Sequence, residues 1–171
     1  MRVVLLIAAA ALVSCSPPAE RPADAPPSAP PAAVVCNDLA PDYAHMVSVS
    51  DPVATPALAD LSGGRITPGT YDLVRATRIN NATGWAGEQA VALRVAEADG
   101  GVTLDWAAGA QGGALDTWTA HFTDTPAVRL TYTCGRLGEV DAAFTARPNG
   151  LDLRVQDGAS GALLLTFERR A

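Results

Sequence analysis

From residue 70 to the C-terminus, apolar and polar residues alternate along the chain in short runs. Leu104 and Trp106, for example, are separated by the charged Asp105. A period of two places the apolar residues on one face, which is typical of a half-buried β-strand. The alternation occurs in eight runs, which cover residues 70–79, 91–96, 102–106, 117–122, 128–134, 140–145, 151–155 and 163–168. The pattern predicts eight strands.

Short turn-like segments separate these runs. Asp99-Gly100-Gly101 and Asn149-Gly150 are strong hairpin signals because Asn, Asp and Gly tolerate the positive φ of tight turns. Further turns are expected at Asp124-Thr125-Pro126, 135–138 and 157–161. Because no stretch of crossover length interrupts the runs, we expect successive antiparallel hairpins and exclude a parallel sheet.

An open meander of eight strands would expose two edges, and closure of the sheet removes both. The predicted fold is therefore all-β, a single antiparallel up-and-down barrel of about eight strands over residues 35–171. A barrel of this size either fills itself with side chains or holds one small ligand. Residues 37–61 are poorly patterned, with a short strand expected at 44–49 and one helical turn at 56–61. We expect this segment to wrap against the main body, held there by Cys36.

The N-terminus carries a different pattern. One positive charge, Arg2, precedes an unbroken apolar run from residue 3 to residue 13, and the run ends in Leu12-Val13-Ser14-Cys15. A positive start, a short apolar run and a small-residue cleavage site are typical of a secretory signal peptide. The run is shorter than the roughly 20 residues that a spanning helix needs. Residues 1–14 are therefore interpreted as a signal peptide.

Leu12-Val13-Ser14-Cys15 resembles the lipobox of bacterial lipoproteins. The resemblance implies that the signal is cut before Cys15, that Cys15 is acylated, and that the membrane is a partner through this lipid. Ser16 is not Asp, which by resemblance to Gram-negative lipoproteins implies attachment to the outer membrane, facing the periplasm. The alternative is a chance cysteine near the end of an ordinary signal peptide.

Residues 15–34 are rich in proline and alanine and offer little apolar surface to bury. Such a segment cannot offset the entropy of ordering, so we interpret it as an extended spacer between lipid and domain. A proline-rich ligand for a partner domain is the alternative.

Three cysteines occur in the chain, and assigning Cys15 to the lipid leaves Cys36 and Cys134. An even remainder in an oxidising compartment suggests a disulfide between them. Two buried free thiols are the alternative.

The charge distribution argues against nucleic acid as a partner. The formal net charge is -6, and the basic residues are all arginines, scattered along the chain with only Arg169 and Arg170 adjacent. No basic stripe is present to neutralise phosphates.

Candidate catalytic chemistry is sparse. The two histidines, His45 and His121, lie far apart and have no Cys or carboxylate at metal spacing. No nucleophile elbow, phosphate loop or dinucleotide glycine pattern occurs in the sequence. We therefore expect no enzyme, no metal site and no cofactor.

Aromatic residues give the best indication of binding. Trp106, Trp118 and Tyr132 fall on apolar strand faces, where they are either core residues or ligand contacts. Trp85 lies in the longest gap between runs, 80–88, and would be either a lid residue or a plug at one end of the barrel. These four residues are the candidate contacts for a ligand or partner.

The opening strand Gly69-Thr70-Tyr71 follows an irregular segment, and the meander after it is similar to the lipocalin-type barrels. The segments 69–73 and 166–169 also resemble the opening and closing strands of small bacterial lipoproteins, a resemblance that implies no activity. We expect a tethered binding module for a small apolar ligand or an envelope protein partner. Tyr132-Thr133-Cys134-Gly135 is weakly similar to membrane-bound lysozyme inhibitors, so an inhibitor is one alternative. A purely structural lipoprotein is another.

Overall fold

The computed structural model describes residues 34–51, 61–123 and 128–171. The expected signal peptide, Cys15 and the linker up to residue 33 lie outside these residues. So do nearly all of the expected helical turn at 56–61 and the expected turn at Asp124-Thr125-Pro126. The described ranges contain no α-helix. They hold no helix with the length and apolar character needed to span a bilayer.

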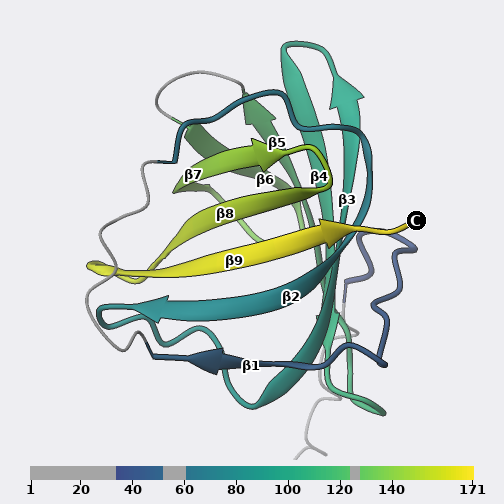
Figure 1. The fold of residues 1–171 in the computed structure, drawn as a ribbon, viewed down its shortest axis with the longest axis vertical. Coiled ribbons are helices and arrows are strands. Elements are labelled where there is room, and N and C mark those ends of the chain that lie inside the picture. Colours follow the sequence, from purple (N-terminus) through teal and green to yellow (C-terminus); the bar gives the residue numbers. More distant parts are fainter. Residues whose placement is uncertain (1–33, 52–60, 124–127) are drawn as a thin grey trace, which may run out of the picture. The chain divides into compact units, whose positions relative to one another are not determined.

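Nine strands form one sheet in the described part of the chain (Figure 1). They are β1 (Val47–Ser50), β2 (Gly69–Ile79), β3 (Glu88–Ala98), β4 (Gly101–Gly109), β5 (Asp116–Thr123), β6 (Val128–Cys134), β7 (Glu139–Arg147), β8 (Gly150–Asp157) and β9 (Gly161–Arg169). From β2 to β9 each strand pairs antiparallel with the next. The predictions of an all-β domain and of eight strands in an antiparallel meander are confirmed.

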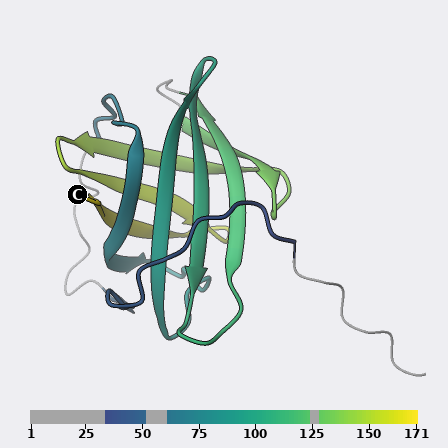
Figure 2. The ribbon, with the colours of Figure 1, turned by 90° about the vertical axis from the view of Figure 1, so that its right-hand side faces the viewer.

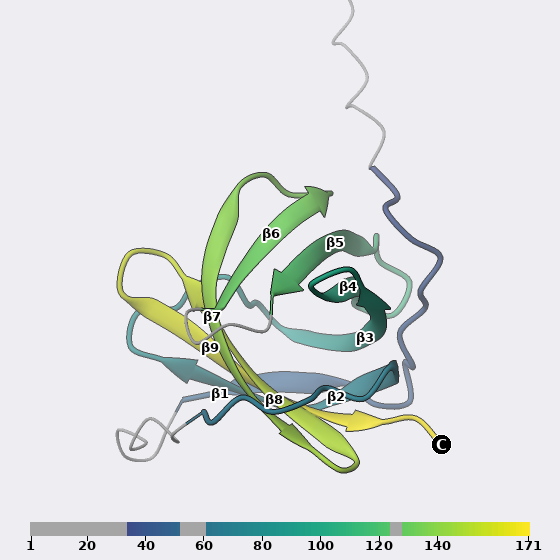
Figure 3. The ribbon, with the colours of Figure 1, turned by 90° about the horizontal axis from the view of Figure 1, so that it is seen from above.

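The first and last strands of the meander pair with each other and close the sheet into a ring (Figures 1 and 3). The register runs from Tyr71 opposite Arg169 to Ile79 opposite Ala162, with an irregularity between Leu73 and Arg75. Closure gives hydrogen-bond partners to backbone groups that would otherwise be exposed at the two edges.

The ninth strand, β1, overlaps the short strand expected at 44–49, and its pairing corrects the expected topology in one respect. β2 pairs with β3 only over residues 69–72, and β1 pairs with both strands beyond that point. Its pairing with β3 is antiparallel, but Val49 and Ser50 pair parallel to β2. The exclusion of parallel pairing was wrong for β1, because residues 51–68 are long enough for a parallel connection.

The centre of the ring is packed with side chains from alternating positions. Along β4, Leu104 and Trp106 belong to the core cluster and the partly buried Val102 packs against it, while the side chain of Asp105 pairs with Arg94. The largest fully buried side chains are those of Tyr71, Phe122, Phe167, Leu73, Leu93, Leu104, Leu130, Leu151, Leu153 and Val91. The apolar face that the alternation predicts is therefore the interior face of the ring.

The N-terminal segment crosses the outside of β5, β4 and β3 (Figure 2). The Asn37 side-chain amide donates to the carbonyl oxygens of Trp106 and Trp118, at 3.3 and 3.1 Å. Leu39 packs on Ala92 and Ala107, where small side chains let the segment approach the sheet. The expectation that this region wraps against the main body is confirmed for its described residues.

The expected disulfide between Cys36 and Cys134 is present, with 5.6 Å between the Cα atoms. It joins the N-terminal segment to the end of β6 across 98 residues of sequence. The described chain is thus fixed to the ring almost at its first residue, Val34.

Candidate functional site

The four aromatic residues singled out in the sequence lie around one pocket at one end of the ring. Trp106 comes from β4, Trp118 from β5, Tyr132 from β6 and Trp85 from the loop between β2 and β3. The pocket, here called the tryptophan pocket, has a volume of about 110 Å³. Leu163 and Leu165 of β9 line the same space, so the walls are mainly apolar.

The two strand tryptophans form a stacked pair. Trp106 and Trp118 are directly opposite each other in the β4–β5 register. Their ring centroids are 5.2 Å apart and their planes differ by 10°. Tyr132 meets Trp118 edge to face at 5.3 Å. Such aromatic pairs contribute roughly 0.5–1.5 kcal/mol beyond the area that they bury.

Both stacked indoles carry a polar group that the fold leaves unsatisfied. Trp106 and Trp118 are 7% and 3% exposed. Neither Nε1 has a hydrogen-bond partner among the described residues, and each nitrogen is inaccessible to solvent. A buried donor without an acceptor costs about 1–3 kcal/mol, so two of them in adjacent side chains are unusual.

Arg136 lies over the aromatic cluster from the tight turn between β6 and β7. Its guanidinium carbon is 5.8 Å from the centre of Trp118 and 5.9 Å from that of Tyr132, within the range of cation–π attraction. Asp116 pairs with Arg136 at 2.7 Å. Burial acts to lower the pKa of Arg136, but the Asp116 carboxylate and Tyr132 raise it, and the net shift is upward. Arg136 therefore stays charged.

Trp85 lines the pocket as a buried side chain. It is 5% exposed, and its indole N–H donates to the Gly87 carbonyl at 3.1 Å. Of the two readings of the sequence, lid and plug, these contacts favour a plug. The Asp157 carboxylate holds the loop by accepting from the backbone N–H groups of Thr83 and Gly84, both at 2.6 Å. Sequence reasoning missed Asp157, because it took residues 157–161 only as a turn.

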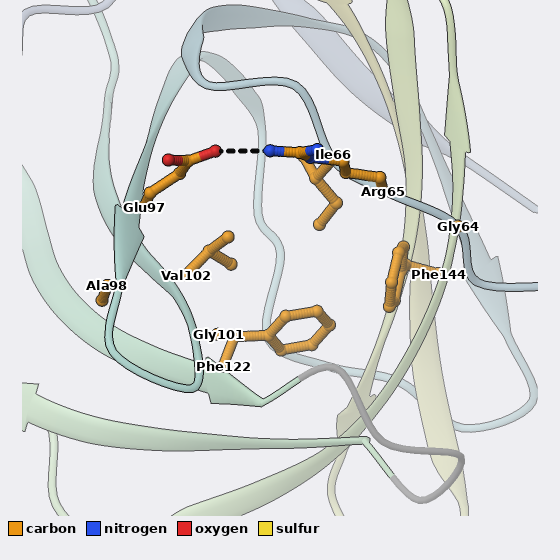
Figure 4. A pocket seen from close by; sticks show the side chains of 9 residues that line it. All are labelled: Gly64, Arg65, Ile66, Glu97, Ala98, Gly101, Val102, Phe122 and Phe144. Carbon is orange, nitrogen blue, oxygen red and sulfur yellow. Dashed lines mark hydrogen bonds and ion pairs between the residues drawn. The ribbon is translucent and has the colours of Figure 1, made fainter.

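A second pocket lies at the opposite end of the ring (Figure 4). We call it the strap pocket, because residues 61–68 form a strap beside it. Ile66, Val102, Phe122 and Phe144 face a space of about 410 Å³. Gly63 of the strap exchanges backbone hydrogen bonds with β7.

The strap is also joined to β3 by one ion pair. Arg65 and Glu97 are 2.9 Å apart, with side chains 86% and 63% exposed. An exposed pair of this kind contributes only about 0–1 kcal/mol, so it is a weak link.

A packed layer separates the two pockets. On β4, Leu104 lies between Val102 of the strap pocket and Trp106 of the tryptophan pocket, and it is 0% exposed. On β5, Ala120 occupies the same layer between Phe122 and Trp118 and is also 0% exposed. Leu104 and Ala120 therefore separate the tryptophan pocket from the strap pocket along β4 and β5.

The histidines and cysteines do not gather into a reactive centre. Within the described ranges, no group of three His, Cys, Asp or Glu side chains is placed to hold a metal ion. His45 contacts Asp42 in an exposed turn, and His121 lies on β5, half-buried, opposite Thr103 and Thr131. Cys36 and Cys134 are bonded to each other in the disulfide.

Comparison of the chain with family models, curated proteins and solved structures found no match in any of the three.

Proposed function

We propose that this protein is a membrane-tethered binding module that holds a small apolar ligand in the tryptophan pocket. As part of this proposal, we take the closed sheet to be an up-and-down barrel of the lipocalin type. Its support is the closed ring of sequential antiparallel strands with end pockets. Ligand sites are typically concave, mostly apolar and equipped with a few polar groups, and barrel mouths are common places for them.

The observation that carries the ligand proposal is the convergence of four aromatic side chains from four separate segments on one void. Core packing alone would be expected to fill such a void, because protein interiors hold few spaces larger than a water molecule. The pocket volume of about 110 Å³ is smaller than the about 150 Å³ of a cavity that binds benzene. The pocket therefore suits a compact group somewhat smaller than benzene.

Dichloromethane, a compact apolar molecule smaller than benzene, tests this proposal. At a concentration tenfold above its dissociation constant, we expect it to stabilise the fold by about 1.4 kcal/mol and to raise the melting temperature by a few degrees. Calorimetry of the chain from residue 15 onward, with and without dichloromethane, measures the shift.

Two filling variants locate the bound dichloromethane. Ala108→Leu narrows the tryptophan pocket and should abolish the shift, whereas Val102→Phe narrows the strap pocket and should leave it unchanged. No shift in the unsubstituted chain rejects the apolar-ligand proposal, and loss only in Val102→Phe moves the site to the strap pocket.

The tether in this proposal is the lipid on Cys15, in the outer membrane and facing the periplasm. A proline-rich spacer extends about 3.1 Å per residue, so residues 15–34 reach roughly 60 Å at most. Val34, Val35 and Leu137 are exposed apolar side chains near the disulfide in sequence, where the spacer ends. Apolar side chains at this place support a position close to lipid.

Cys15→Ser should move the protein from the membrane fraction to the soluble fraction, because the thiol is the expected attachment atom. Detergent phase partition and intact mass measure the change. Cys36→Ser is the matched control, since it removes a thiol that is not expected to carry lipid. Membrane retention of Cys15→Ser, or an unmodified Cys15 in the native protein, contradicts the tether.

A further inference from the structure

Exposed large apolar side chains gather in one region of the surface. The described residues contain five such exposed side chains, which are those of Val34, Val35, Val74, Leu115 and Leu137. Val74 lies on β2, in another part of the ring. The other four are here called the apolar rim. Single exposed apolar residues are normal on a protein surface, whereas a group of them marks a place of interaction.

Thr117, near the start of β5, brings two members of the rim together. Its hydroxyl donates to the Val34 carbonyl at 3.3 Å and accepts from the backbone N–H of Cys36 at 3.2 Å. Leu115 lies two residues before Thr117 and is 41% exposed. Val34 and Leu115 are therefore close neighbours, although they are distant in sequence.

Leu137 reaches the same region through the disulfide. Cys134, at the end of β6, is bonded to Cys36, and Leu137 follows in the turn to β7. Gly135 and Gly138 have φ values of 79° and 82° in this turn, and the Leu137 side chain is 98% exposed. An aliphatic side chain in that position adds nothing to the core, and its contact with water is unfavourable.

The rim borders the tryptophan pocket. Asp116 and Arg136 line that pocket, and they are next in sequence to Leu115 and Leu137 respectively. The two charged side chains pair with each other at 2.7 Å, so opposite charges balance beside the rim. A partner that contacts the rim would therefore also lie beside the tryptophan pocket.

We propose that the apolar rim is a docking surface for a lipid bilayer, into which Leu137 inserts beside the tryptophan pocket. This inference rests on the proposed lipid tether and adds an orientation of the domain to it. The spacer joins the described fold at Val34, which belongs to the rim. A tether raises the effective concentration of the bilayer at this place, so a few apolar contacts suffice for docking. Apolar faces at a membrane surface enter about 5–10 Å into the boundary between headgroups and acyl chains.

Two other occupants fit the rim less well. Residues 15–33 contain no Val, Leu, Ile, Met or aromatic residue, so the spacer has no large apolar side chain with which to cover the rim. A second copy of the chain would need a larger surface, because a stable dimer buries roughly 800 Å² per partner and the rim consists of four aliphatic side chains.

The charge of the chain predicts which bilayers it docks on. The formal net charge is -6, and Asp116 already neutralises Arg136 beside the rim. Anionic lipid attracts basic segments and repels an acidic protein. Docking should therefore occur on neutral phosphatidylcholine and should not become stronger when phosphatidylglycerol is added.

Methyl resonances of the acylated chain in nanodiscs test the inference. The nanodiscs contain dimyristoylphosphatidylcholine and a 5-doxyl lipid, whose spin label broadens resonances just below the headgroups. We expect the Leu137 methyl resonances to be lost and those of Val35 and Leu115 to weaken. Val74 is the matched control, because it is an exposed apolar residue outside the rim, and its resonances should keep their intensity.

Two serine variants measure the contribution of the inserted side chain. Leu137→Ser should lower the ratio of docked to undocked chain about tenfold, the effect of removing one buried leucine from lipid. The Leu115 resonances should regain intensity in this variant. Val74→Ser is the matched control and should change nothing. Both substituted side chains are exposed, so neither variant should disturb the fold.

The possible results separate the inference from the proposed function. If the rim and Val74 keep equal intensity, or lose it equally, the docking surface is overturned while an acylated Cys15, seen by intact mass, preserves the tether. If broadening requires phosphatidylglycerol, the contact is electrostatic and the apolar rim is not its cause. If the rim resonances respond to protein concentration and not to the doxyl lipid, the occupant is a second copy. If Cys15 carries no lipid, the proposed tether fails and the inference fails with it.

Discussion

Replacing both Cys36 and Cys134 with serine should lower the free energy of unfolding by about 4 kcal/mol. The disulfide closes a loop across 98 residues, and the chain-entropy relation for a loop near 100 residues gives roughly 4.7 kcal/mol. Strain and residual structure in the unfolded chain usually reduce the measured value below that limit. Urea denaturation in the Cys15→Ser background, where no other thiol is present, measures the loss.

Reducing agent provides the control for this experiment. It should destabilise the parent chain by a similar amount and leave the double-serine variant unchanged. The variant should also expose its N-terminal segment to proteolysis, since Asn37 and Leu39 would hold that segment by non-covalent contacts alone. A loss below about 1 kcal/mol would contradict the assigned role of the bond.

The second large effect is expected at the layer between the two pockets. Leu104→Ala should cost about 3 kcal/mol, because a buried Leu→Ala change removes apolar contacts and leaves a cavity, with a usual range of 2–5 kcal/mol. The new cavity would connect the tryptophan pocket to the strap pocket. The variant should therefore bind the longer probe butylbenzene, which the parent chain excludes.

Thr103→Ala is the matched control on the same strand. Thr103 is only half-buried and adjoins Leu104 on the opposite face of β4, so its loss should change stability by about 0.5 kcal/mol or less. Denaturation midpoints and butylbenzene titrations of the two variants give both readouts. Equal stability of the two variants would mean that the layer is not a packed partition.

The strands of the meander were predictable because the sequence of each strand shows the alternation of apolar and polar residues by itself. Alternation such as Val102, Leu104, Trp106 depends only on the period of a strand, and turn residues mark where each run ends. Closure followed from the need to pair the edges. The eight strands of the meander therefore came from local patterns, and the ring form came from the argument about edges.

The wrapping of the N-terminal segment against the ring was predicted, but the residues that it covers were not. Ala92 and Ala107 face away from the interior, yet both are fully buried, because Leu39 lies on them. Alanine at an outward position gives no signal of a covering segment. A short strand was expected where β1 lies, but its pairing was not, since four residues with a parallel partner lack the turn that identifies a hairpin.

The candidate site was predictable in its members and not in its arrangement. The alternation placed Trp106, Trp118 and Tyr132 on apolar strand faces. Whether these side chains contact one another depends on the register of β4, β5 and β6. The six residues between β4 and β5 do not fix that register by themselves. The unsatisfied indole donors are a property of the packed structure and have no sequence signal.

The position of the disulfide also determines how the domain would respond to a pulling force on the proposed lipid anchor and spacer. Tension along the spacer enters the fold at Cys36 and passes through the sulfur bridge to β6, which is hydrogen-bonded to strands on both sides. Residues 37–51, including the short β1, bear little of that load. With the disulfide intact, the ring would therefore resist unfolding by a pulling force. Reduction of the disulfide would pass the force to residues 37–51 and the short β1.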